Sequence, residues 1–132
     1  MVSETRVKIW CWDYIKRIAI YKDKLAVQLP EWIIIYAVSP DDPFDMKYKA
    51  TKKISKKLDC DMLFVLSKHL IASKGKTIQL FNFNGVVEWE WILDTDVTYM
   101  KVMGGAPGRE GIILSLISGA ILKIFVDNAF PV

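Results

Sequence analysis

The hydrophobic residues of the chain fall in short runs, each bounded by polar or turn-forming residues. Runs of this kind, rich in Ile, Val, Leu, Phe, Tyr and Trp, are typical of consecutive β-strands. Helical spacing is approached only at Ile54 and Leu58, between two such runs, and a strand followed by a turn is favoured there. The pattern therefore predicts an all-β chain. The expected strands cover residues 5–12, 16–21, 24–29, 32–38, 46–54, 61–67, 69–73, 77–83, 86–93, 97–103, 111–117 and 120–126.

The order of these strands repeats along the chain. With a shift of 45 residues, Leu25 falls on Leu70 and Ile35 falls on Leu80. A third copy follows over residues 97–127, with a longer first turn. A repeat of ~40–45 residues that holds four short strands is typical of a β-propeller blade of the WD40 type. The repeat predicts a WD40-like β-propeller fragment of about two to three blades, each a four-stranded antiparallel sheet.

The expected blades cover residues 14–56, 57–96 and 97–132, and residues 5–12 would form the last strand of a preceding blade. Propellers close with about 4–8 blades, so the chain is expected to be an arc of a larger propeller. An arc exposes apolar faces and strand edges at both ends, and alone it is expected to be poorly soluble or to associate. The pattern also leaves open an independent sandwich or partly open barrel.

Five of the seven glycines lie between Val102 and Asn128. A glycine-rich loop can hold a phosphate when it opens a helix, but a strand is expected after this loop. The glycines are better explained as residues that allow positive φ angles in hairpin connections. The predicted structural turn residues are Gly104, Gly105, Gly108, Gly111 and Gly119.

The composition agrees with a folded domain and limits the classes of protein and the cellular compartments to be considered. Of the 132 residues, 52% are hydrophobic and 25% are charged, which is enough for a core. The net charge of +3 is too mild to indicate a nucleic-acid-binding protein. Cys11 and Cys60 are expected to be reduced core thiols of an intracellular protein. Neither a secretory signal nor a transmembrane segment is expected, because the uncharged run 111–122 is shorter than the ~20 residues needed to span a bilayer.

The residue types needed for catalysis are sparse. His69 is the single histidine, and three Cys and His residues are too few for a structural zinc site. Asp41, Asp42 and Asp45 lie in a proline-containing turn without the spacing of an ion-binding loop. We therefore expect no enzyme activity, no cofactor and no small-molecule substrate.

Two features could serve an interaction surface. Four lysines form the densest basic patch: Lys52, Lys53, Lys56 and Lys57. They could contact RNA or acidic lipid, but lysines also protect strand edges from pairing, and that interpretation is favoured. Two tryptophan pairs, Trp10 with Trp12 and Trp89 with Trp91, share a side of a strand. They could stack on bases or lie at an interface, but burial between blades is favoured.

Three segments carry a more specific resemblance: KRIAIYKDKLAVQLPE at 16–31, GGAPGREG at 104–111 and GAILKIFVDNAF at 119–130. They resemble the second propeller of the intraflagellar transport protein 122 family, the WD-repeat subunit of intraflagellar transport complex A. The resemblance runs from about Val7 to Phe130. It implies a large scaffold with two N-terminal propellers and a helical-repeat region.

The resemblance also implies a function. The chain would be a non-catalytic, protein-binding segment that supports retrograde transport, cilium assembly and cargo entry to cilia. Its implied partners are other subunits of complex A, and nucleic acid is not expected among them. The implied locations are the cytoplasm, the cilium and the ciliary basal body. The alternative from another class is a free-standing β-domain that binds RNA or acidic lipid through the lysine patch and the tryptophans.

Overall fold

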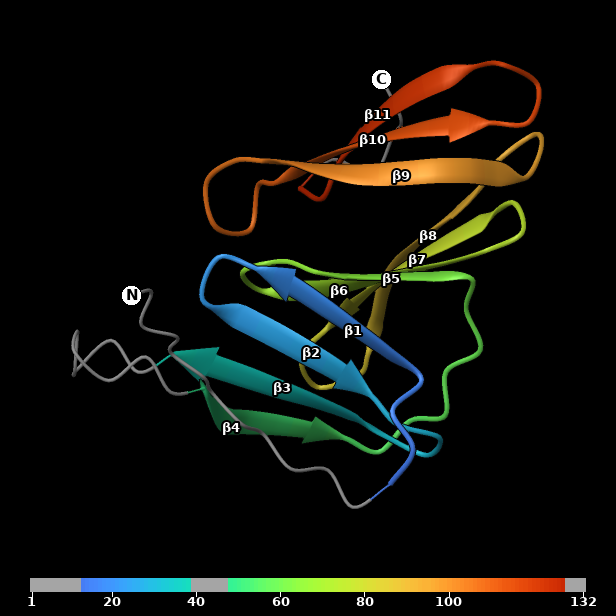
Figure 1. Ribbon diagram of the computed structural model, residues 1–132. Coiled ribbons are helices and arrows are strands. Elements are labelled where there is room, and N and C mark those ends of the chain that lie inside the picture. The colour runs from blue at the N-terminus through green and yellow to red at the C-terminus, as the bar shows by residue number, and fades with distance from the viewer. Residues whose placement is uncertain (1–12, 39–47, 128–132) are drawn as a thin grey trace, which may run out of the picture.

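The computed structural model describes residues 13–38 and 48–127. Within these residues the chain forms three antiparallel sheets and no helix, so the predicted all-β class is confirmed. The sheets are stacked one upon another in chain order, from the blue strands to the orange and red ones (Figure 1). The strand expected at residues 5–12, with Trp10, Trp12 and Cys11, lies outside the described residues, as do Asp41, Asp42 and Asp45.

Each sheet is a meander in which strands that follow each other in the chain lie side by side. The bounds of the strands agree closely with the predicted runs. The first sheet contains β1 (Arg17–Tyr21), β2 (Lys24–Gln28), β3 (Ile33–Val38) and β4 (Tyr48–Ile54). The second contains β5 (Met62–Val65), β6 (His69–Lys74), β7 (Thr77–Asn82) and β8 (Val87–Ile92). The third contains β9 (Val97–Gly104), β10 (Gly111–Leu116) and β11 (Ile121–Phe125).

The core lies between the sheets. Alternate residues of a strand point to opposite faces, so each sheet can present two apolar faces. One cluster packs Ala26 and Ile35 of the first sheet against Leu70 of the second. Another packs Leu80 of the second sheet against Ile112 of the third. The middle sheet is therefore covered on both faces. A third, smaller cluster with Val27 and Tyr36 lies on the other face of the first sheet.

A buried polar contact accompanies the apolar packing of the first two sheets. Gln28 on β2 is fully buried, and its Nε2 donates a hydrogen bond to the Leu58 carbonyl at 2.6 Å. The Cys60 thiol lies 3.8 Å from Gln28 Oε1 as a weak donor. Burial raises the pKa of this thiol. Cys60 is free and buried, as predicted.

Of the second tryptophan pair, one side chain is buried and the other is exposed. Trp91 is opposite Ile78 and Trp89 is opposite Leu80, so both lie on the face toward the third sheet. Trp91 is 4% exposed within the second core cluster, but Trp89 is 42% exposed. A register shift beside Phe81 interrupts the pairing of β7 with β8 next to Trp89. Burial between sheets, the favoured interpretation, is therefore right for Trp91 and wrong for Trp89.

Four of the five glycines singled out above have positive φ angles: 91° at Gly104, 142° at Gly105, 80° at Gly108 and 93° at Gly119. Gly111 differs, because it begins β10 and pairs with Phe125. A Cβ at Gly111 would lie 2.9 Å from Cε1 of that ring. Close approach within the sheet, rather than a turn, explains this glycine.

Replacing Gly119 by valine is expected to lower the free energy of unfolding by about 1–3 kcal/mol, the cost of a strained backbone. No atom lies within 4 Å of the added Cβ, so steric contact contributes little. Thermal unfolding would measure the effect. The matched control is Ser118→Val, which adds a valine to the exposed neighbour without a positive φ. An equal melting temperature for Gly119→Val and the unchanged chain would contradict the turn assignment.

Candidate interaction surfaces

The glycine-rich connection 105–110 joins β9 to β10 at one end of the stack of sheets. The β1–β2 and β5–β6 turns lie at the same end (Figure 1). Lys22 Nζ, from the β1–β2 turn, donates to the Gly105 carbonyl at 3.4 Å. A Cβ at Gly108 would lie 3.5 Å from Lys68 Cδ, from the β5–β6 turn. These three connections therefore form one surface, here called the loop end, to which all three sheets contribute.

A buried carboxylate fixes the glycine-rich connection. Glu110 is fully buried, and its Oε2 accepts a hydrogen bond from the Ser67 N–H at 2.9 Å. Its Oε1 accepts one from the Gly108 N–H at 2.8 Å. Burial by itself raises the pKa of the Glu110 carboxyl, but hydrogen bonds from Ser67, from Gly108 and from its own backbone outweigh burial and leave the pKa lowered. The ionised side chain thus holds the connection on the β5–β6 turn.

Glu110 was not singled out in the sequence. It is a single acidic residue between a glycine-rich turn and an apolar strand. The signal that could have identified it is this position, since a charge next to a buried strand needs hydrogen-bond donors. The donors here are backbone N–H groups, one of them 43 residues away in the chain.

The predicted lysine patch lies on β4 and just after it. Lys52 Nζ donates to Asn84 Oδ1 at 3.0 Å, and Lys56 Nζ donates to the Gly85 carbonyl at 3.3 Å. Both contacts reach the β7–β8 turn, so these two side chains connect the first sheet to the second. Lys53 Nζ lies 3.3 Å from the ring centroid of Trp32. Lys57 is exposed.

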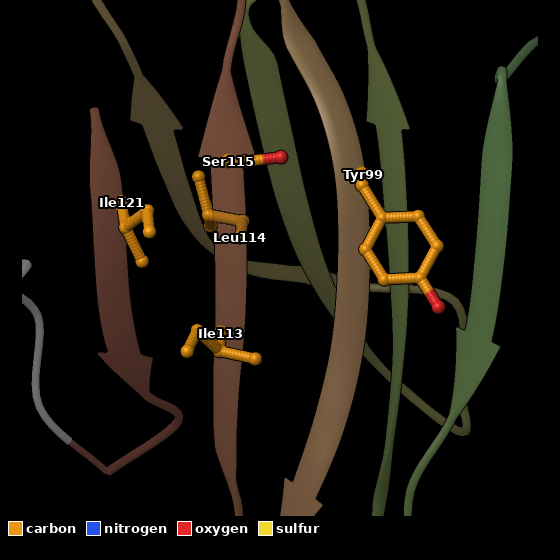
Figure 2. A pocket seen from close by; sticks show the side chains of 5 residues that line it. All are labelled: Tyr99, Ile113, Leu114, Ser115 and Ile121. Atoms are coloured by element: carbon orange, nitrogen blue, oxygen red, sulfur yellow. The ribbon is translucent and has the colours of Figure 1, made fainter. Parts of the chain in front are cut away.

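The outward face of the third sheet carries exposed apolar side chains, with Lys101 and Lys123 beside Ile113 on the same face. Tyr99 is 62% exposed and Ile121 is 69% exposed. They line a shallow groove of about 180 Å³ with Ile113, Leu114 and Ser115. Figure 2 shows these side chains arriving from all three strands, Tyr99 from β9 and Ile121 from β11. On the first sheet, Ile18 and Ile20 are each 67% exposed, on the face where Val27 and Tyr36 are buried.

The described residues contain no group of three or more His, Cys, Asp and Glu side chains that could hold a metal ion. His69, the single histidine of the chain, contacts a carboxylate: its Nε2 lies 3.0 Å from Glu88 Oε2. No helix among the described residues is long and apolar enough to cross a bilayer.

Comparison with a solved structure agrees with the fold. The chain is similar to the crystal structure of BBS1N in complex with ARL6DN, soaked with lead, with a TM-score of 0.65. The match covers 94% of this chain and 40% of that one at 14% identity, so it bears on fold alone.

Comparison by sequence identifies the family. The family model described as the IFT122 second beta-propeller matches residues 1–132. The chain is 46% identical to the intraflagellar transport protein 122 homologs of Xenopus tropicalis and Homo sapiens, and 44% identical to that of Danio rerio. Each match covers 100% of this chain and 11% of the relative's length. The chain is a β-propeller segment that belongs to the intraflagellar transport protein 122 family.

Proposed function

We propose that the chain is a non-catalytic scaffold segment of an intraflagellar transport complex A subunit and that it binds other subunits of this complex. The observation that carries the proposal is the match of the IFT122 second beta-propeller model to the whole chain. In this role the segment would support retrograde transport, cilium assembly and cargo entry to cilia. It would act in the cytoplasm, the cilium and the ciliary basal body.

A free-standing domain that binds RNA or acidic lipid is not favoured. That alternative depended on the lysine patch and the tryptophans. Lys52 and Lys56 are hydrogen-bonded to the second sheet, and Trp91 is buried against the third. Family membership accounts for the whole chain without it.

We further propose that each sheet is one propeller blade, with blades at residues 14–56, 57–96 and 97–132. The first and second sheets pack face to face, and so do the second and third. The open groove at Tyr99, Ile113 and Ile121 would receive a further blade in the same manner. In this arrangement Gly105, Gly108 and Gly119 act in the connections between strands, whereas Gly104 is the last residue of β9. The patch of Lys52, Lys53, Lys56 and Lys57 stays a candidate contact surface at the outer strand of the first blade.

The experiment is co-purification of the tagged full-length protein with complex A subunits from ciliated cells. The unchanged protein is expected to bring these subunits with it. Ile113→Lys together with Ile121→Lys is expected to reduce recovery several-fold, because two buried ammonium groups would oppose packing of the next blade. Ser118→Lys, in an exposed turn beside the same sheet, is the control. Failure of the unchanged protein to recover any subunit would contradict the proposed function.

A further inference from the structure

We propose that the loop end is a docking surface for an acidic segment of a protein partner. The inference rests on the proposed function and deepens it by naming the chemistry of one partner. Three cationic side chains gather there, each from a different sheet: Lys22 after β1, Lys68 after β5 and Arg109 before β10. All three are exposed, Arg109 with 76% of its side chain.

Contacts with the glycine-rich connection bring these cations together. Lys22 Nζ is hydrogen-bonded to the Gly105 carbonyl, and the alkyl part of Lys68 lies beside Gly108. Glu110, through Ser67 and Gly108, holds the connection in place. A partner that contacts both lysines therefore meets the first and second sheets at once, on a surface that is already ordered. Little side-chain and loop ordering then opposes binding.

The backbone at Lys22 supports a role for this side chain. Its φ is 52°, and Lys22 is the one non-glycine residue with a positive φ among those that the structure describes. Glycine or asparagine adopts this conformation more readily, so a lysine here carries a backbone cost. In exchange, the ammonium group is placed at the carbonyl of Gly105 and 5.3 Å from the ring centroid of Tyr21.

The carboxylates at the loop end are already compensated. Asp23 pairs with Lys24 at 3.0 Å, and Asp127 lies 4.0 Å from Arg109. Glu110 is buried and satisfied by N–H groups. Within the described part of the chain, neither Lys22 nor Lys68 forms a salt bridge. These two lysines are the cations left for a partner.

An extended acidic peptide fits this arrangement better than a membrane or nucleic acid does. The ion pairs of Asp23 with Lys24 and of Asp127 with Arg109 lie beside Lys22 and Lys68, so the loop end has separate positive points and no continuous cationic surface for a membrane or a nucleic acid. A peptide can place its carboxylates at the lysines and neutral residues beside the two aspartates. The net charge of +3 also gives little general attraction for polyanions.

The test uses a fluorescein-labelled peptide of alternating Glu and Gly, titrated with the chain at low salt and followed by fluorescence anisotropy. Lys22→Glu together with Lys68→Glu is expected to weaken binding about tenfold, since two attractive contacts become repulsive. The control, Lys16→Glu together with Lys76→Glu, makes the same charge change at two exposed lysines that lie before β1 and between β6 and β7, at the ends of β1 and β6 opposite the loop end. It is expected to weaken binding less than about twofold. Melting temperatures would show that both variants fold.

Equal weakening by the two double variants would overturn the proposal, because binding would then follow net charge alone. Absence of peptide binding would overturn it as well, including the case in which the chain binds vesicles that contain phosphatidylserine. The outcome is separable from the proposed function. If the full-length protein recovers complex A subunits but the peptide does not bind, the docking surface is refuted and the proposed function stands. If the peptide binds through the two lysines but no subunit is recovered, the proposed function is refuted and the docking surface stands.

Discussion

Replacing Ile112 by alanine is expected to lower the free energy of unfolding of the chain by about 3 kcal/mol. Ile112 is 2% exposed and lies in the cluster between the second and third sheets. The alanine variant loses the transfer free energy of the removed methyl and methylene groups and leaves a cavity among rigid strands. The loss is a large part of the total stability of a small domain, about 5–15 kcal/mol.

The control is Ile121→Ala in the same sheet, where the isoleucine is 69% exposed. Its effect is expected to stay within about 0.5 kcal/mol. Urea unfolding at two protein concentrations would measure both variants, because association through the open faces would make the midpoint depend on concentration. Equal losses at the two positions would mean that the third sheet does not pack on the second as described.

Replacing Glu110 by alanine is expected to cost about 2–4 kcal/mol, because two charge-assisted hydrogen bonds are lost and their N–H donors stay near the buried site. Glutamine retains one carbonyl oxygen and is expected to cost less. Thermal unfolding at neutral pH would give the order unchanged chain, Glu110→Gln, Glu110→Ala. A glutamine variant as unstable as the alanine variant would show that the amide cannot replace either bond.

The pH dependence of the free energy of unfolding is a second test of the role of Glu110. The folded state lowers the pKa of this carboxyl from its ordinary value of 4.5. The contribution to stability is therefore fully present above pH 4.5 and is lost as the pH falls through the lower pKa of the folded state. Below 4.5 the unchanged chain should lose its advantage over Glu110→Gln, whose residue 110 does not titrate. Other carboxyls, such as Asp59, act in both proteins and cancel in the difference. A constant difference down to about pH 3 would contradict the ionised role.

Much of the fold could be predicted from the order of residues. The run GIILSLI, for example, indicates both a strand and its buried face, on which Ile112 and Leu114 lie. The strand after the glycine-rich connection was expected for this reason and is confirmed. Hairpins with short connections join neighbours in the chain, so the meander of each sheet follows from local pattern as well.

The details that depend on contacts between sheets could not be predicted in this way. Trp89 and Trp91 have the same spacing and chemistry, and only the packing of the third sheet separates the buried ring from the exposed one. Lys52 gives no sign in the sequence that it meets Asn84. Glu110 was overlooked because its donors come from other segments of the chain. Gly111 was assigned to a turn because its role depends on Phe125 across the strand pair.

The buried amide of Gln28 and the buried carboxylate of Glu110 both limit how the segments that they join can move relative to each other. Apolar contact between two sheets is non-directional, so a small slide or rotation would cost little by itself. A hydrogen bond loses strength steeply with misalignment. Gln28 makes such a bond beside the first junction of sheets, and Glu110 makes one beside the second. Glu110 therefore resists a slide of the third sheet along the second, and Gln28 holds the connection that leads from the first sheet to the second.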